Sequence, residues 1–207
     1  WGIKGSLKES ESISLMAVTG CLPLVTEYPK NLTNFGSQKC TNNYLQINKI
    51  INSLSFEKII IVFNYQQFKT FDNELEIFEN SANVFFKKLD SFQNDNFIIV
   101  GQPVVWKENL RNIIYKEIKL GESNFSQKDS KYLIDNLFVY EESYKLLADS
   151  FNYDYFSIIE LFCDSQECAR LSIENNKTYL FFRDHIHLSK FSSNILAEKL
   201  LQYIESN

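Results

Sequence analysis

Short, uniformly apolar runs alternate along the chain with longer segments in which apolar residues recur at helical spacing. The clearest run, Lys58–Asn64 (KIIIVFN), is too uniformly apolar for a half-exposed strand and predicts a central strand buried on both faces. Asn96–Val100 (NFIIV) has the same character and is followed by a turn signal, Gly-Gln-Pro at 101–103. Weaker strand patterns lie at residues 12–18, 153–159 and 178–182.

Five segments have the apolar spacing of helices, at residues 42–53, 73–91, 106–119, 128–149 and 189–205. The last is the best defined, because its apolar residues share one face and Ser189 stands at the position of an N-terminal cap. Those apolar residues are Phe191, Ile195, Leu196, Leu200, Tyr203 and Ile204. The alternation of strands and helices predicts a three-layer α/β/α fold with a mostly parallel central sheet, in which strands 58–64 and 96–100 are adjacent and parallel.

Composition and charge narrow the class of protein. The chain has 207 residues, of which 44% are hydrophobic and 23% charged, as in an ordinary globular protein. We expect a single domain over residues 1–207, because this length suits one hydrophobic core and no linker or composition break divides it. The 21 basic and 26 acidic residues give a net charge of −5 without a long basic run, which argues against a nucleic-acid partner. No apolar run approaches the roughly 20 residues of a membrane-spanning helix, and no signal-peptide pattern opens the chain.

The four cysteines form two pairs that are close in sequence, Cys21 with Cys40 and Cys163 with Cys168. Neither pair has the CxxC spacing of a zinc ribbon or a thioredoxin-like site, and an even number of cysteines is typical of disulfides in an oxidising compartment. A polar, proline-containing segment lies between Cys21 and Cys40, where a buried free thiol has little to pack against, so disulfides are the favoured interpretation. The alternative is four reduced thiols in a cytosolic core.

Both histidines of the chain lie in the motif RDHIHLS, between the last predicted strand and the last helix. Reactive groups collect in such strand-to-helix loops of α/β proteins. Asp184 and His187 are three residues apart, so a tight turn brings the carboxylate to the imidazole, where it fixes the tautomer and stabilises the protonated ring. This spacing predicts that His187, and not His185, is a general base; the alternative is that both rings are exposed polar loop residues. A metal site is disfavoured, because the chain has no further histidine to complete one.

Two other residues follow predicted strands and are candidate donors to a developing oxyanion. Gly20 follows strand 12–18 and offers backbone N–H groups, and Asn64 ends strand 58–64 with a side-chain amide. The alternative for each is an ordinary loop glycine and a capping asparagine.

The order of these motifs resembles a known family. Trp1-Gly2, the Gly20 turn with Cys21, then Cys40, the IIIVF strand, the Gly-Gln-Pro turn, Cys163 and Cys168, and finally Asp-x-x-His before Leu-Ser are similar to the SGNH-hydrolase-like domain of bacterial O-acyltransferases. In these enzymes the domain is fused behind an integral-membrane acyltransferase-3 module, and they acetylate surface polysaccharides. The resemblance covers nearly the whole chain.

The resemblance implies a serine–histidine–aspartate triad in which Asp184 orients His187 and His187 activates a serine. It also implies the disulfides Cys21–Cys40 and Cys163–Cys168 and a periplasmic or outward-facing location. The partners would be a cell-surface glycan as acyl acceptor and the N-terminal membrane module. That module would supply the acyl donor, so no cofactor is expected in this chain. Since the chain starts at Trp1, we expect it to be a domain of a longer membrane protein.

The chain departs from the family pattern where the nucleophile belongs. The family places its serine in a Gly-Asp-Ser block after the first strand, whereas here Trp1-Gly2 continues into Ile-Lys-Gly-Ser, so the nucleophile is unassigned. Three explanations, in order of preference, are a segment missing near residues 2–3, a natural pseudoenzyme, and use of another serine such as Ser6. For the oxyanion donors, Gly20 matches the family glycine, while Asn64-Tyr65 stands where acyltransferase-linked members carry an Arg-Trp-like pair.

The interpretation that follows is transfer of an acyl group, most simply acetyl, to a sugar hydroxyl of a bacterial cell-surface polysaccharide through a seryl ester. The first alternative is a carbohydrate O-acetyl esterase, since only the acceptor differs between the two reactions. The second is a catalytically inactive glycan-binding module, which the missing Gly-Asp-Ser block motivates.

Overall fold

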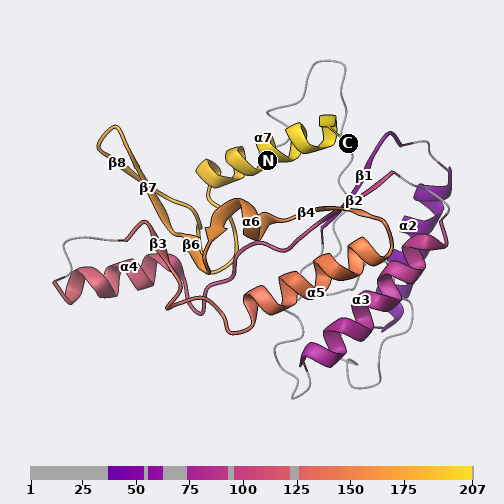
Figure 1. The fold of residues 1–207 in the computed structure, drawn as a ribbon, viewed down its shortest axis with the longest axis horizontal. Helices are drawn as coiled ribbons and strands as arrows, with labels where there is room; N and C mark the ends of the chain where they lie inside the picture. Colours follow the sequence, from indigo (N-terminus) through magenta and orange to yellow (C-terminus); the bar gives the residue numbers. More distant parts are fainter. Residues whose placement is uncertain (1–36, 54–55, 63–73, 93–95, 122–125, 207) are drawn as a thin grey trace. The chain divides into compact units, whose positions relative to one another are not determined.

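The computed structural model describes residues 37–53, 56–62, 74–92, 96–121 and 126–206 (Figure 1). The predicted strand at 12–18 and the candidates Ser6, Gly20, Cys21 and Asn64 lie outside these residues, as does the side chain of Cys40. The chain divides into two compact units, which are described separately. The sheet unit comprises the described residues of Ser14–Gly101 with Glu142–Tyr155, and the histidine unit comprises those of Gln102–Glu141 and Phe156–Asn207.

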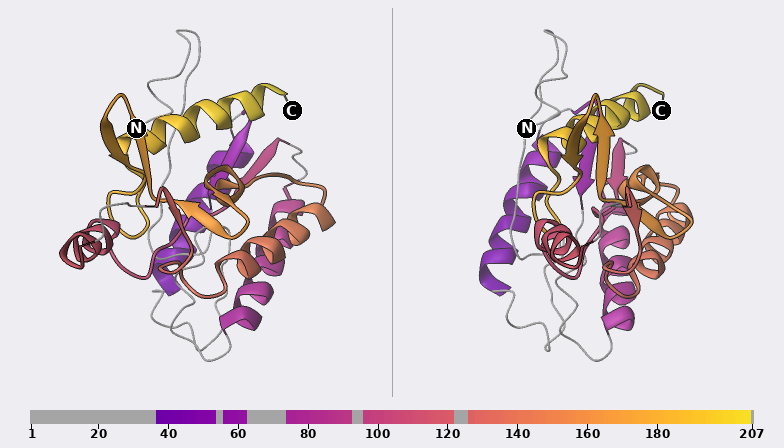
Figure 2. Two further views of the ribbon diagram at one scale, coloured as in Figure 1. Left: turned by 60° about the vertical axis from the view of Figure 1, so that its left-hand side comes forward. Right: turned by 90° about the vertical axis from the view of Figure 1, so that its left-hand side faces the viewer.

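The sheet unit is built around two parallel strands. β1 (Ile59–Val62) pairs with β2 (Phe97–Val100) in register from Ile59 with Phe97 to Val62 with Val100, and the two lie side by side in Figure 2. The sheet order is β1-β2-β4, with β4 at Asp154–Phe156. The predicted α/β class and the adjacent, parallel pairing of these strands are therefore confirmed.

Burial of the two strands is unequal. All four residues of β2 are buried, as predicted. The prediction that β1 is buried on both faces is wrong, because its first three residues are half-buried and Val62 is 57% exposed. β2 lies between two strands, whereas β1 has one strand neighbour within the described sheet, which leaves its other edge uncovered by these strands.

An aromatic cluster forms the core of the sheet unit. α3 (Glu74–Asp90) carries Phe85 and Phe86, and both rings pack on Tyr144 of α5 (Leu137–Ser150), at centroid distances of 6.4 and 5.2 Å. Figure 1 shows the two helices side by side. Phe86 also stacks on Phe151. α2 (Ser37–Ser53) and α3 correspond to the helices predicted at 42–53 and 73–91, and the first begins earlier than predicted.

The histidine unit combines short antiparallel strands with three helices. Its antiparallel sheet has the order β3-β6-β5, and β7 and β8 form a separate hairpin. In chain order the elements are α4 (Leu110–Lys119), β3 (Lys128–Asp129), α6 (Ile158–Phe162), β5 (Cys163–Asp164), β6 (Glu167–Ala169), β7 (Leu171–Glu174), β8 (Lys177–Leu180) and α7 (Lys190–Ser206).

Two helices begin later than the sequence predicts. The helix predicted at 106–119 starts at Leu110, because the side chain of Asn109 accepts the N–H of Arg111 and caps it. The helix predicted at 128–149 starts at Leu137, because Asn136 has a left-handed backbone (φ 61°) that no α-helix continues through. Residues 128–129 pair instead with β6.

Two predicted strands also have different bounds. The strand predicted at 153–159 ends at Phe156, because Ser157 accepts the N–H of Glu160 and starts α6. The strand predicted at 178–182 is β8, and it pairs antiparallel with β7 through a turn at Asn175 and Asn176. The prediction missed β7 although Asn-Asn, whose residues tolerate left-handed backbone, is a hairpin signal.

A buried ion triad joins three parts of the histidine unit. Arg170 is 2% exposed and pairs with Glu117 of α4 (Nη1 to Oε1, 3.0 Å) and with Asp129 of β3 (Nη1 to Oδ2, 2.5 Å). Burial by itself lowers the pKa of Arg170, but the two carboxylates outweigh it and raise the pKa above its ordinary value. The guanidinium therefore stays charged and ties the helix to the sheet.

Candidate active site

The loop that carries both histidines is closed tightly at its base. The N–H of Arg183 donates to the carbonyl of His187 (2.7 Å), and the N–H of Ser189 donates to the carbonyl of Phe181 (2.9 Å). Below the loop, Phe182 is fully buried and packs edge-on against Trp106, with ring centroids 5.9 Å apart. The loop between β8 and α7 is thus a short turn fixed on a hydrophobic base.

Asp184 and His187 are brought together as the sequence predicts. Asp184 Oδ2 lies 2.8 Å from His187 Nδ1, and Asp184 Oδ1 accepts the backbone N–H groups of Ile186 (3.0 Å) and His187 (2.9 Å). One carboxylate oxygen therefore shapes the turn and the other holds the ring. In the neutral imidazole this arrangement places the proton on Nδ1 and leaves Nε2 as an acceptor.

The surroundings of Asp184 keep it ionised. Partial burial favours the neutral acid, but the backbone hydrogen bonds from His187 and Ile186, together with the His187 side chain, outweigh it and hold the pKa of Asp184 well below its usual range. The side chain of Asp184 is 23% exposed, whereas that of His187 is 63% exposed. A negative charge held behind an accessible ring is the arrangement that general-base catalysis requires.

His185 has a different place in the loop. Its Nδ1 is 3.9 Å from Asp184 Oδ1, which is beyond hydrogen-bond distance, while its backbone carbonyl accepts the N–H of Trp106 (2.9 Å). His185 therefore holds the loop in place through its backbone carbonyl and not through its ring. No pattern in the sequence indicates this role of Trp106.

The start of α7 holds the loop from the other side. Ser189 caps the helix, because its Oγ accepts the N–H of Ser192 (3.3 Å) and its carbonyl accepts the N–H of Ser193 (2.9 Å). Ser192 is fully buried, and its hydroxyl donates to the carbonyl of Phe181. The predicted cap is confirmed, and Ser192 is an additional anchor that the apolar pattern of the helix did not indicate.

No serine among the described residues is hydrogen-bonded to His187. The described serine that most resembles an activated hydroxyl is Ser157, which donates to Glu141 Oε1. Both residues are buried, and Ser157 also caps α6, so this pair is an internal structural contact. The nucleophile stays unassigned, and Gly20 and Asn64, the candidate oxyanion donors, lie outside the described residues.

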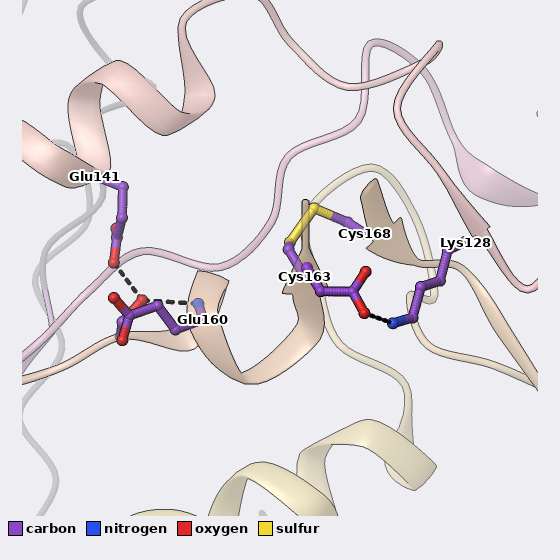
Figure 3. Close-up of a disulfide and its surroundings, with 7 residues drawn as sticks. Lys128, Glu141, Glu160, Cys163 and Cys168 are labelled. Atoms are coloured by element: carbon purple, nitrogen blue, oxygen red, sulfur yellow. Dashed lines mark hydrogen bonds and ion pairs between the residues drawn. A yellow bond between two sulfur atoms is a disulfide. The ribbon is translucent and has the colours of Figure 1, made fainter. Parts of the chain in front are cut away.

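Cys163 and Cys168 are joined by a disulfide, the pairing that the family resemblance implies (Figure 3). The two residues also face each other across the antiparallel pair β5–β6, and Lys128 forms an ion pair with Asp164 beside them. The predicted bridge from Cys21 to Cys40 lies outside the described residues.

Within the described ranges, no group of three or more histidine, cysteine and carboxylate side chains is arranged to hold a metal ion. In the same part of the chain, no helix has the length and apolarity needed to cross a membrane.

A parallel α/β sheet and an Asp-x-x-His pair in the loop before the last helix are the features of an SGNH-type hydrolase-like domain. The family model described as "SGNH domain (fused to AT3 domains)" matches residues 1–202, and the chain belongs to this family. No functionally curated relative matches the chain.

A solved structure with a similar fold is the periplasmic domain of a lipopolysaccharide acetyltransferase from Salmonella ser. Paratyphi A. The match has a TM-score of 0.65 at 16% sequence identity, and it covers 88% of this chain and 67% of that one. The predicted SGNH-like fold is thereby confirmed.

Proposed function

We propose that this chain is the acyl-transfer domain of a polysaccharide O-acyltransferase, which moves an acetyl group to a sugar hydroxyl of a bacterial cell-surface polysaccharide. The observation that carries the proposal is the Asp184–His187 pair, with its 2.8 Å contact and its exposed ring. Membership of a family whose domains are fused to AT3 domains supports it, as does the fold shared with a lipopolysaccharide acetyltransferase domain.

The reaction proceeds in two balanced steps. In the first, His187 Nε2 takes the proton of a serine hydroxyl, the serine oxygen attacks the acyl carbonyl, and the leaving group of the donor departs with that proton. In the second, His187 takes the proton of the sugar hydroxyl, whose oxygen attacks the seryl ester, and the freed serine recovers the proton. Asp184 stabilises the imidazolium that forms in each step.

The domain works on the extracytoplasmic side of a bacterial inner membrane in this proposal, with an N-terminal membrane module supplying the acyl donor. The Cys163–Cys168 disulfide supports such a location, because disulfides persist in oxidising compartments. The AT3 fusion that the family description records supports the membrane module.

A carbohydrate O-acetyl esterase is the second candidate function. It is favoured by the exposure of His187, since water reaches a ring that is 63% exposed and replaces the sugar as acceptor. A glycan-binding module without catalysis is motivated by the missing Gly-Asp-Ser block.

The test is genetic complementation with the full-length protein. Deletion of the gene should remove O-acetyl signals from the proton NMR spectrum of the purified surface polysaccharide, and the wild-type gene should restore them while His187→Ala should not. A deletion that increases the O-acetyl content identifies an esterase. Restoration by His187→Ala contradicts catalysis through this ring and favours the binding module.

A further inference from the structure

The histidine unit contains a pocket of about 360 Å³ that the proposed mechanism does not use. Leu133, Ile134 and Phe138 supply the apolar part of its lining, here called the floor; Leu133 and Ile134 are buried and Phe138 is half-buried. Its rim is polar and includes Lys107, Asp135 and the turn residues 165–167. Most of the lining is polar, and a cavity of this size that combines many polar groups with some apolar side chains suits a small polar molecule with an apolar face.

The turn at the rim is held in a costly conformation. Ser165 and Gln166 join β5 to β6, and both have left-handed backbone, with φ of 45° and 68°. Hairpin turns of this kind ordinarily use Asn-Gly, because other side chains cost energy in this conformation. The Cys163–Cys168 disulfide and the strand pairing hold the turn in place. Side chains kept where glycine is easier indicate that the pocket needs them.

The pocket lies close to the Asp184–His187 loop. The segment around Trp106 lies between two others. On one side it pairs with the segment of Leu133, where the N–H of Lys107 donates to the carbonyl of Tyr132 (2.7 Å). On the other side the N–H of Trp106 donates to the carbonyl of His185 (2.9 Å). Neighbouring extended segments are about 4.8 Å apart, so the backbone at Leu133 is about 10 Å from that at His185. The pocket floor and the catalytic loop are therefore built on the same three adjacent segments.

We propose that this pocket is the subsite for a neutral saccharide unit of the acyl acceptor, an inference that rests on the proposed function. The ring of Phe138 and the side chain of Leu133 contact the C–H face of the sugar. Gln166 and Lys107 donate to its hydroxyl oxygens, and Asp135 and Glu167 accept from its hydroxyl groups. The 2.9 Å ion pair between Lys107 and Asp135 orients part of the rim. Two rim carboxylates against one ammonium disfavour a sugar that carries a carboxylate.

The test replaces both turn residues by ones that keep the turn intact. Ser165→Asn/Gln166→Gly installs the residues that a left-handed turn prefers, so it should raise the thermal unfolding midpoint. The matched control is Asn176→Gly in the β7–β8 turn, which is left-handed as well (φ 60°) and does not line the pocket. The probes are galactose, glucose, mannose and rhamnose, with glucuronate as the acidic comparison, titrated into the isotope-labelled chain and followed by amide NMR.

We expect a neutral probe to shift the amides of residues 107 and 165–167. The double variant should weaken its binding by roughly tenfold or more, as loss of hydrogen bonds to a ligand does, and the control should bind as wild type does. Equal affinity in the double variant, stronger shifts with glucuronate, or no shifts with any neutral probe would overturn the proposal. Failure of the proposed function is distinguishable, because His187→Ala would then leave polysaccharide acetylation intact while these shifts persist.

Discussion

The backbone N–H of Trp106 donates to the carbonyl of His185, whereas the ring of His187 is held by the carboxylate of Asp184. The two histidines, two positions apart, thus contribute through different parts of the residue. His185 positions the loop through its main chain, which a side-chain substitution does not remove.

This difference predicts unequal effects on acyl transfer for the two alanine substitutions in the full-length protein. His187→Ala should reduce acyl transfer by on the order of 10⁴-fold, as loss of a triad base does, while His185→Ala should change it little. Polysaccharide acetylation rates in membranes, with equal protein levels, provide the measurement. Equal losses from the two variants would contradict the assignment.

The depressed pKa of Asp184 predicts an acid-sensitive loop. A carboxylate whose folded-state pKa lies below the unfolded value of about 3.9 contributes stability above that value and loses it as the pH falls toward the folded pKa. The thermal unfolding midpoint of the wild-type protein should therefore decrease as the pH is lowered below about 4. The midpoint of Asp184→Asn, which cannot ionise, should decrease less over the same range. Thermal melts from pH 7 to pH 2 measure this difference; parallel curves for the two proteins would refute it.

The apolar pattern predicted the parallel pair of the sheet unit, because β2 is buried throughout and its sequence shows this directly. It misplaced helix starts, because these depend on single residues: the Asn109 cap and the left-handed Asn136. Of the short antiparallel strands in the histidine unit, β3, β5, β6 and β7 were missed, since runs of two to four residues rarely show a period of two.

The part of the candidate site formed by residues close together in sequence was predictable. Asp184 and His187 are three residues apart, so a turn brings them together, and the spacing alone indicates it. The contribution of Trp106 was not predictable, because its hydrogen bond joins segments that are distant in sequence and involves only backbone atoms. Ser192 was missed because it lies buried on a helix face where the pattern led us to expect apolar residues.

The Arg170 triad predicts a large dependence of stability on one buried contact. Glu117→Gln should destabilise the fold by about 3–5 kcal/mol, because it leaves the buried guanidinium with one carboxylate fewer. The matched control is the exposed pair of Lys116 with Glu108, where Lys116→Ala should cost about 0–1 kcal/mol. Urea unfolding of both variants gives the comparison. A buried variant as stable as the surface one would show that the triad does not hold α4 to the sheet.

The buried amide of Gln102, two residues after the end of β2, predicts a stabilising substitution. Its side chain is buried, with 2% of the residue exposed, and neither amide atom has a hydrogen-bond partner within the described part of the chain. An unsatisfied buried polar group costs about 1–3 kcal/mol, so Gln102→Met, which keeps the length and removes the amide, should raise the free energy of unfolding by an amount in this range. Gln102→Glu is the control, since it adds a buried charge at the same place and should destabilise the fold. Urea denaturation measures the free energy of unfolding of both variants. A Gln102→Met protein less stable than wild type would show that the Gln102 amide has hydrogen-bond partners in solution.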